Sequence, residues 1–482
     1  MRVLDQLEPR KVFSFFEDLC AIPHGSGNTK AISDYCVKFA KDRGLEVHQD
    51  HLNNVVIVKP ATKGYEASPT VIVQGHLDMV TEKTPESPID FLKDRLDLAI
   101  DGDFVYAKGT TLGGDDGIAV AMALAVLDSD DLEHPRLECL FTIDEETGMD
   151  GAVGFDASGL QGKRLLNIDS EEEGILTVSC AGGAHADVHI EMAQNECALS
   201  AAELAVTGLK GGHSGAEIDK GRANATITLG RVLQALVDEL EVRLVSAEGG
   251  LKDNAIPNAA KAVIALDEEK ISRAQEICAE LEATLKKEYA AADPDVTVTF
   301  TPGGVADKAL SLVDTRRVCT FLGLYPNGIE SMSMDIPGLV QTSCNLGIFK
   351  VDEAGLKGSG SVRSSVASRK QMLLRRIRLL AEGLEGTMRV SGEYPAWEYK
   401  RESHLRDVMC RVYEAQYGEP MKVEAIHAGL ECGLFCGKIP GLDAVSFGPN
   451  LYDIHTTKER MSAASVWRVY EYLCAVLREL KD

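Results

Sequence analysis

The sequence has no run of apolar residues long enough to cross a membrane, which takes about 20 consecutive residues. Its first residues, MRVLDQLEPRKVFSFF, include acidic side chains and no small-residue cleavage site, so we expect no secretory leader. Basic side chains are the minority, with 50 Lys and Arg against 75 Asp and Glu and a formal net charge of −25. This acidic balance argues against nucleic acid and against an anionic membrane surface as partners.

Paired cysteine spacing is also lacking. The 12 cysteines are scattered between Cys20 and Cys474, unlike the pattern of small disulfide-rich secreted domains. Cys432 and Cys436 are four residues apart, as on one helix face, but no second pair accompanies them to complete a metal site. We therefore expect free thiols in a reducing compartment, and a cytoplasmic protein.

The chain of 482 residues is too long for one simple core, so two domains are expected. Strands alternate with helices in the first and last parts of the chain, which predicts an α/β fold with a mostly parallel central sheet. Between these parts, strands that end without carboxylates alternate with amphipathic helices. We predict a catalytic domain formed by residues 1–185 and 391–482, interrupted by an α+β lid domain at 186–390.

Apolar strands of the first part end in acidic or imidazole side chains. His76 and Asp78 follow the apolar run VIVQG, and alternate strand residues face one side, so both can reach one site. Other strand ends and loops carry Asp115 with Asp116, Glu145 with Glu146, Asp169, and finally His455. Each residue alone also fits a structural role, such as a hydrogen-bonded His or a solvated turn. Together they are expected at the carboxyl ends of neighbouring strands, where sites of parallel sheets collect.

The mixture of imidazoles and carboxylates favours a site for divalent cations. Buried carboxylates are costly unless they are paired or bind a metal. Two His with several carboxylates, and no thiolate among them, suit two zinc ions, with cobalt or manganese as alternatives. One carboxylate can bridge two ions about 3.5–4 Å apart. A further carboxylate must remain free to take a proton from water, so in the pair Glu145 and Glu146 one can ligate while the other acts as base.

Seven motifs also occur in a characteristic order: GHLDMV, GTTLGGDDG, DEETGMDGA, NIDSEEEG, KGGHSG, NAIP and HAGLECGLF. In this series the sequence resembles the aminoacyl-histidine dipeptidases, a carnosinase-type family of di-zinc exopeptidases. The resemblance covers essentially the whole chain. It implies a catalytic domain of the zinc-exopeptidase type, a lid domain, a homodimer, and a small peptide as substrate.

Carried over position by position, the resemblance implies a role for each site residue. The metal ligands are His76 and Asp169 on one ion, Glu146 and His455 on the other, and Asp115 bridging both. Asp78 orients His76, Glu145 is the general base, and His213 in the lid stabilises the oxyanion. Asn254 and Arg363 hold the substrate, Arg363 by clamping its free carboxylate, with a surface salt bridge as the alternative for Arg363. His427 and Glu431 line the pocket for the substrate's amine or imidazole, with a structural role as the alternative. His213 would act after closure of the lid or from a neighbouring subunit.

The sequence therefore predicts a hydrolase that cleaves small unblocked dipeptides, Xaa-His among them, by a metal-bound hydroxide with a Glu general base. A broader di- or tripeptidase, or an N-acyl amino acid deacylase of the same family, would share every metal ligand and differ in substrate. A catalytically inactive scaffold with this fold is a further alternative, against which the intact ligand set argues. The segments around Arg363 and His455, SGSVRSS and YDIHTTKER, differ from the family pattern and bear on the preference for a C-terminal His.

Overall fold

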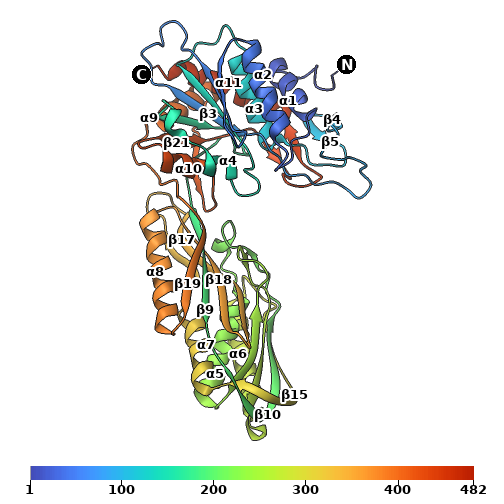
Figure 1. Ribbon diagram of the computed structural model, residues 1–482, viewed down its shortest axis with the longest axis vertical. Helices are drawn as coiled ribbons and strands as arrows, with labels where there is room; N and C mark the ends of the chain where they lie inside the picture. The colour runs from blue at the N-terminus through green and yellow to red at the C-terminus, as the bar shows by residue number, and fades with distance from the viewer. Residues whose placement is uncertain (1, 482) are drawn as a thin grey trace. The chain divides into compact units, whose positions relative to one another are not determined.

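The computed structural model describes residues 2–481, which divide into two compact units. Unit 1 comprises the chain up to Ser179, Tyr399–Ala425 and the chain from Leu430 onwards, and unit 2 comprises Cys180–Glu398 and Ile426–Gly429. The colours of Figure 1 follow the chain through both units. The lid range expected from the sequence, 186–390, lies inside unit 2. The short return of the chain to unit 2 at Ile426–Gly429 was not expected.

An eight-stranded sheet forms the centre of unit 1, in the order β1-β2-β6-β3-β7-β21-β8-β20 (Figure 1). Its strands are β1 (Glu46–Gln49), β2 (Val55–Lys59), β3 (Val71–His76), β6 (Leu137–Thr142), β7 (Arg164–Asn167), β8 (Ile175–Cys180), β20 (Lys422–Ile426) and β21 (Asp443–Ser446). The four central strands β6, β3, β7 and β21 run parallel, whereas β1, β2 and β8 pair antiparallel with their neighbours. The α/β prediction is confirmed, and its parallel part is the centre of the sheet.

The helices of unit 1 are α1 (Arg10–Cys20), α2 (Lys30–Asp42), α3 (Gly114–Leu127), α4 (Asp150–Gly154), α9 (His404–Tyr417), α10 (Glu431–Lys438) and α11 (Ala463–Glu479). Beyond its first turn, helix α3 is apolar on all sides, which fits its burial between β3 and the helices α1 and α11. No helix within residues 2–481 is both long enough and apolar enough to traverse a lipid bilayer. The cysteines of residues 2–481 are thiols outside disulfide bonds.

A second, four-stranded sheet of unit 1 has the order β22-β23-β5-β4. Its strands are β4 (Leu98–Asp101), β5 (Phe104–Ala107), β22 (Leu451–Tyr452) and β23 (Arg460–Ser462). Strands β22 and β23 pair antiparallel, so the chain between them forms a hairpin loop, which carries His455. This small sheet thus anchors a loop that the sequence assigned to the site.

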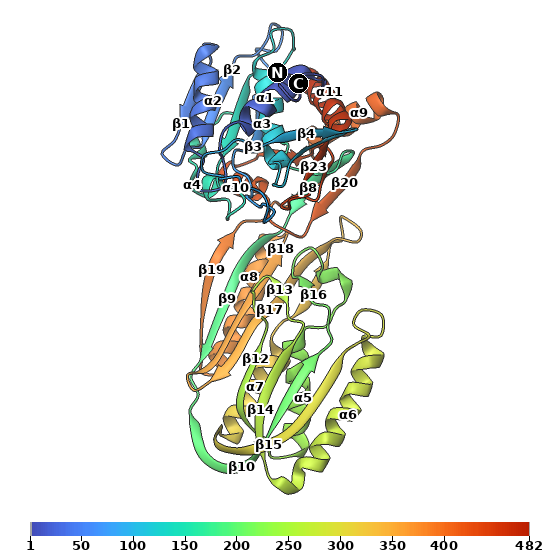
Figure 2. The same ribbon diagram turned by 90° about the vertical axis from the view of Figure 1, so that its right-hand side faces the viewer.

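Unit 2 is built on a nine-stranded antiparallel sheet with the order β15-β10-β14-β12-β17-β18-β9-β19, and β16 pairs with β17 (Figure 2). Its strands are β9 (Gly182–Ile190), β10 (Gln194–Thr207), β12 (Arg243–Gly249), β14 (Ala260–Leu266), β15 (Thr297–Leu310), β16 (Gly328–Met332), β17 (Val340–Asp352), β18 (Gly355–Ser364) and β19 (Thr387–Tyr394). A two-stranded ribbon joins β11 (Gly212–His213) to β13 (Ala255–Ile256).

Four helices pack on this sheet: α5 (Ala225–Glu239), α6 (Ile271–Glu288), α7 (Leu312–Leu324) and α8 (Ala367–Gly383). The core lies between the helices and one face of the sheet. Along β9, for example, Ala184, Ala186, Val188 and Ile190 belong to the core, and the intervening residues do not, as the twofold alternation of a strand requires. Unit 2 therefore has a hydrophobic core of its own, as expected for a domain.

Candidate active site

The imidazole and carboxylate side chains predicted for the site lie at or just after the carboxyl ends of adjacent parallel strands. His76 is the last residue of β3, Glu145 and Glu146 come shortly after β6, and Asp169 lies two residues beyond the end of β7. Since β6, β3 and β7 are neighbours, their ends present these side chains at one edge of the sheet. Asp115 joins them from the first turn of α3, where its φ and ψ are not helical.

Asp115 lies between the two histidines of the site. Its Oδ1 atom is 3.1 Å from His76 Nε2, and its Oδ2 atom is 3.1 Å from His455 Nε2. His455 Nε2 is also 2.9 Å from Glu146 Oε1, and His76 Nε2 is 3.7 Å from Asp169 Oδ1. The five residues expected to hold metal ions therefore lie together, and each oxygen of Asp115 is next to a different imidazole.

Within residues 2–481, three overlapping groups of side chains could each hold a metal ion. In each group the ligand atoms lie within 4.8 Å of one another. The groups are His76, Asp116 and Asp169; His76, Glu145 and Glu146; and Asp115, Glu146 and His455. The sequence singled out Asp116 only as the neighbour of Asp115. In the structure Asp116 is buried, and its Oδ2 accepts a hydrogen bond from the His76 backbone N–H at 3.2 Å.

Asp78 supports the site mainly through the backbone. The His76 Nδ1 atom is 3.0 Å from the Asp78 carbonyl oxygen and 3.4 Å from its carboxylate. The carboxylate itself accepts hydrogen bonds from Ser26 Oγ at 2.8 Å and from the backbone N–H groups of Glu145 and Glu146 at 3.0 and 3.3 Å. Asp78 thus orients His76 by its carbonyl group and also fixes the turn that carries the two glutamates.

The buried carboxylates of this cluster have shifted pKa values, and their negative charge calls for cationic partners. Burial alone would raise the pKa of Asp115, but hydrogen bonds from His455 and His76 outweigh it and lower the pKa. Burial and the charge of Asp116 raise the pKa of Asp169 well above its ordinary value. Hydrogen bonds to Asp115 and Glu146 raise the pKa of His455 to about 10. Carboxylates that are not all ionised, and imidazoles held by them, fit a donor set for divalent ions.

Glu145 differs from its neighbour Glu146. Burial, and then the charges of Glu146 and Asp115, raise the pKa of Glu145 to about 7, although His76 opposes the shift. A carboxylate with a pKa near neutrality accepts and returns a proton efficiently, which is the property of a general base. The general-base role expected for Glu145 from the sequence stays a prediction.

Four residues predicted to act on the substrate gather in unit 2, around the turn at Gly215. A Cβ atom on Gly215 would lie 2.8 Å from the His427 carbonyl oxygen, 3.0 Å from His213 Cε1 and 3.2 Å from Arg363 Nε. Asn254 belongs to the same group, because its carbonyl oxygen accepts a hydrogen bond from Ser214 N–H at 2.9 Å. The structure thus brings together residues from four separate segments of the sequence.

The hydrogen bonds of His213 define its tautomer. The backbone N–H groups of Gly215 and Ala216 donate to His213 Nδ1 at 3.1 and 3.0 Å, so Nδ1 is an acceptor and carries no proton. In the neutral ring the proton is then on Nε2. Burial and the charge of Arg363 lower the pKa of His213, which favours this neutral form. His213 is therefore fixed as an Nε2–H donor.

Arg363 and His427 have fixed partners as well. Arg363 Nη1 donates to Tyr394 Oη at 3.1 Å, whereas the buried Nε group has no hydrogen-bond partner within residues 2–481. His427 Nε2 lies 2.7 Å from Ser343 Oγ. Burial and the charge of Arg363 lower the pKa of His427 to about 4. The group therefore has a single cationic side chain with an unused donor, which suits an anionic ligand.

Glu431 belongs to unit 1, although it is only four residues from His427 of unit 2. It is the first residue of α10 in unit 1 and is fully buried. Its Oε2 atom accepts hydrogen bonds from Gln74 Nε2 at 2.6 Å and Thr142 Oγ1 at 2.8 Å. Glu431 is a buried acceptor beneath the strand ends, and the substrate contact expected for it stays a prediction.

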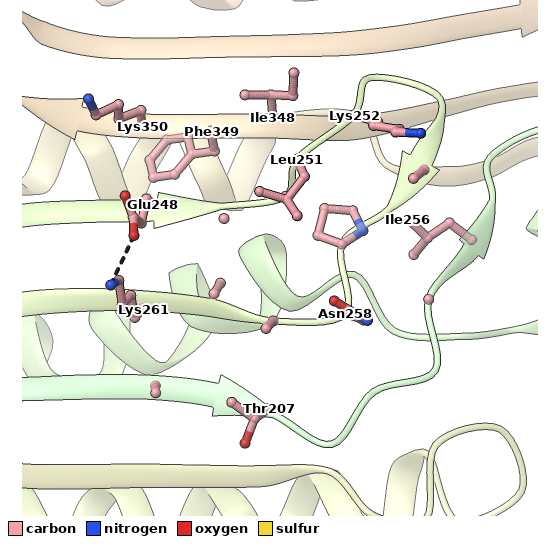
Figure 3. Close-up of a pocket in the computed structure, with 18 of the residues that line it drawn as sticks. Thr207, Glu248, Leu251, Lys252, Ile256, Asn258, Lys261, Ile348, Phe349 and Lys350 are labelled. Atoms are coloured by element: carbon pink, nitrogen blue, oxygen red, sulfur yellow. Dashed lines mark ion pairs between the residues drawn. The ribbon is translucent and has the colours of Figure 1, made fainter. Parts of the chain in front are cut away.

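A hollow of about 700 Å³ lies on the sheet of unit 2 (Figure 3). Its wall includes Leu251, Ile256 and Ile348, and the ion pair between Lys261 and Glu248 at 3.0 Å. None of the residues expected to bind metal or substrate lines this hollow. It is therefore distinct from the candidate active site.

Comparison with known proteins agrees with the geometry. The family model of peptidase family M20/M25/M40 matches residues 72–479. The chain is 36% identical over 485 residues to the cytosol non-specific dipeptidase of Escherichia coli, covering 100% of this chain and 99% of that protein. The crystal structure of an aminoacylhistidine dipeptidase from Vibrio alginolyticus superimposes with a TM-score of 0.95 at 36% identity, covering 99% of this chain and 98% of that one.

A more distant structure, an aminopeptidase of Bacillus cereus, shares the fold with a TM-score of 0.57 at 16% identity, over 99% of this chain and 100% of that one. The fold and the cluster of imidazoles and carboxylates are those of a metallopeptidase, a hydrolase of peptide bonds. The chain belongs to peptidase family M20/M25/M40, which it matches over most of its length. The family resemblance inferred from the sequence is confirmed.

Proposed function

We propose that the protein is a cytoplasmic dipeptidase that binds two divalent ions, preferably zinc, and hydrolyses small unblocked dipeptides, Xaa-His among them. The observation that carries the proposal is the Asp115 carboxylate, whose two oxygens each lie 3.1 Å from a different imidazole, His76 and His455. A carboxylate in that position is suited to bridge two ions. The ions would be held by His76, Asp169, Glu146, His455 and Asp115. When bound, the ions supply the Lewis acidity that activates a water and polarises the scissile carbonyl.

The remaining steps belong to side chains. Glu145 takes the proton of the attacking water and delivers it to the leaving amine, for which its pKa of about 7 is suited. His213 donates its Nε2–H to the oxyanion as charge develops there. Arg363 pairs with the free carboxylate of the dipeptide, and Asn254 and His427 line the same group.

The dipeptide assignment is supported by two relatives that are 36% identical over nearly the full length of the chain, one named a non-specific dipeptidase and one an aminoacylhistidine dipeptidase. The two names differ in specificity, so we propose activity on His-ended dipeptides without restricting it to them. A broader di- or tripeptidase and an N-acyl amino acid deacylase would use the same ligands, and only their substrates separate them.

A substrate panel tests the proposal. The metal-reconstituted protein is given carnosine, Gly-His, Ala-His, Leu-Leu and an N-acetylated dipeptide, and amine release is followed. We expect hydrolysis of the unblocked dipeptides and none of the acetylated one. Cleavage of the acetylated compound alone would contradict the proposal and identify a deacylase.

The matched control in this panel is Glu145→Gln, which keeps the size of the side chain and removes its basicity. We expect this variant to bind metal as the wild type does and to lose turnover at least about 100-fold, the usual effect of removing a general base. A near-normal kcat in Glu145→Gln would remove Glu145 from the base role.

A further inference from the structure

A buried carboxylate outside the ligand set ties together two loops that carry ligands. Glu459 is 4% exposed and accepts hydrogen bonds from three successive backbone N–H groups, those of Leu112 at 2.7 Å, Gly113 at 3.2 Å and Gly114 at 2.8 Å. The next residue is Asp115, expected to bridge the ions. Glu459 thus holds the loop immediately before the bridging ligand.

The loop is shaped for this contact. Gly113 has φ of +69°, the left-handed conformation that glycine adopts without strain. Successive N–H groups in such a turn converge on one point and form an anion-binding concavity. A Cβ on Gly113 would lie 2.8 Å from Met79 Sδ, so the loop also packs closely against the segment that follows β3. Glu459 supplies the anion for this concavity from within the chain.

The other end of the connection is the His455 loop. Glu459 lies on the hairpin between β22 and β23, four residues after His455, and its backbone N–H donates to the Thr456 carbonyl oxygen at 3.1 Å. His455 in turn lies 3.1 Å from Asp115 Oδ2. The chain therefore forms a closed ring of contacts: Asp115 to His455, along the hairpin to Glu459, and through the loop back to Asp115.

We propose that Glu459 is a positioning residue that sets the separation of Asp115 and His455, and with it the affinity for the ion that these two side chains share. Hydrogen-bond partners behind metal ligands commonly contribute 10–100-fold to metal affinity. Glu459 differs from such a partner in acting through the backbone of the neighbouring loop. This inference rests on the proposed binding of two ions, and its test separates the two claims.

The test uses the full-length protein with Glu459→Gln, which keeps the volume but has only one acceptor oxygen for three donors. The control is Glu138→Gln. Glu138 is 1% exposed and accepts the backbone N–H groups of Gln161 at 3.0 Å and Gly162 at 2.9 Å. It lies near the start of β6, at the end of the strand opposite to the site. Both variants remove a buried carboxylate that accepts backbone N–H groups, one beside the ligand loops and one away from them, and Glu138 in addition pairs with Arg136 at 2.5 Å.

Zinc affinity and the number of ions per chain are measured by competition with a chelator. We expect wild type and Glu138→Gln to bind two ions alike, and Glu459→Gln to bind one of them 10–100-fold more weakly, with kcat restored at high zinc concentration. Equal affinities in Glu459→Gln and wild type, or equal losses in both variants, would overturn the inference. Wild-type protein that binds no zinc would instead refute the proposed function.

Glu459→Asp covers the case in which Glu459→Gln does not fold. The shorter side chain keeps the charge but cannot reach all three N–H groups, so we expect its zinc affinity to fall several-fold below that of the wild type. An unchanged affinity in Glu459→Asp would overturn the positioning role.

Discussion

Neighbouring carboxyl groups in unit 1 differ in charge state because their partners differ. Asp115, next to two imidazoles, has a lowered pKa, whereas Glu431, with neutral partners, has a pKa raised to about 8 by burial and then by the charge of Glu145. Both hydrogen bonds to Glu431 go to Oε2, and Oε1 has no partner within residues 2–481. This arrangement suits a neutral carboxylic acid, and an amide of the same shape would keep both bonds.

Glu431→Gln tests this charge state through the pH dependence of stability. An acid with a raised pKa holds its proton in the folded state while the unfolded state, with an ordinary pKa of 4.5, has lost it. The free energy of unfolding of the wild type therefore falls as pH rises from about 5 to about 8, by at most about 1.4 kcal/mol per pH unit from this group. We expect a smaller fall in Glu431→Gln, measured by chemical denaturation of the metal-free proteins. Parallel curves would show that Glu431 is ionised in the folded state.

At the scale of elements, strands and a short ribbon of unit 2 hold the side chains predicted to bind the substrate. The β11–β13 ribbon presents His213, while Arg363 is on β18 beside Ser343 of β17, which holds His427. Tyr394 at the end of β19 takes one donor of the Arg363 guanidinium. The Nε donor of this planar group has no partner within residues 2–481 and can pair with a carboxylate, in a geometry that an ammonium group cannot reproduce.

Arg363→Lys tests the carboxylate clamp. The charge is kept, but the paired donors are lost, so we expect KM for free dipeptides to rise about 10–100-fold, the equivalent of losing a charge-assisted hydrogen bond, with kcat changed much less. The control is a dipeptide amide, which lacks the carboxylate and should be an equally poor substrate for both enzymes. An unchanged KM for free dipeptides would contradict the role of Arg363.

The elements also show which parts of the site the sequence could predict. Their positions at strand ends and in loops singled out His76, Asp115, Glu146, Asp169 and His455 as candidates. The separate role of each, including the choice between Glu145 and Glu146, needed the family resemblance. The contacts of Glu459 could not be predicted from the sequence, because the loop that it holds lies about 345 residues earlier in the chain. Long-range hydrogen bonds of this kind depend on tertiary structure, which no local pattern encodes.

At the scale of the whole molecule, the chain is two units with separate hydrophobic cores, one carrying the imidazole–carboxylate cluster and one carrying the group around Gly215. The interruption of the first unit by the second was predictable, since strands ending in carboxylates stop before residue 186 and strand–helix alternation resumes after 390. The return at Ile426–Gly429 was not, because four residues are too few to carry a periodic pattern. His427 and Glu431, which the sequence had assigned to one pocket, belong to different units as a result.

The measurement that tests the central claim most directly is a zinc titration of the metal-free protein, with bound ions counted per chain and hydrolysis of Ala-His followed in the same samples. The account predicts no hydrolysis without metal, and full hydrolysis when two ions are bound to each chain. Hydrolysis that persists after exhaustive chelation, with no ion bound, would contradict it.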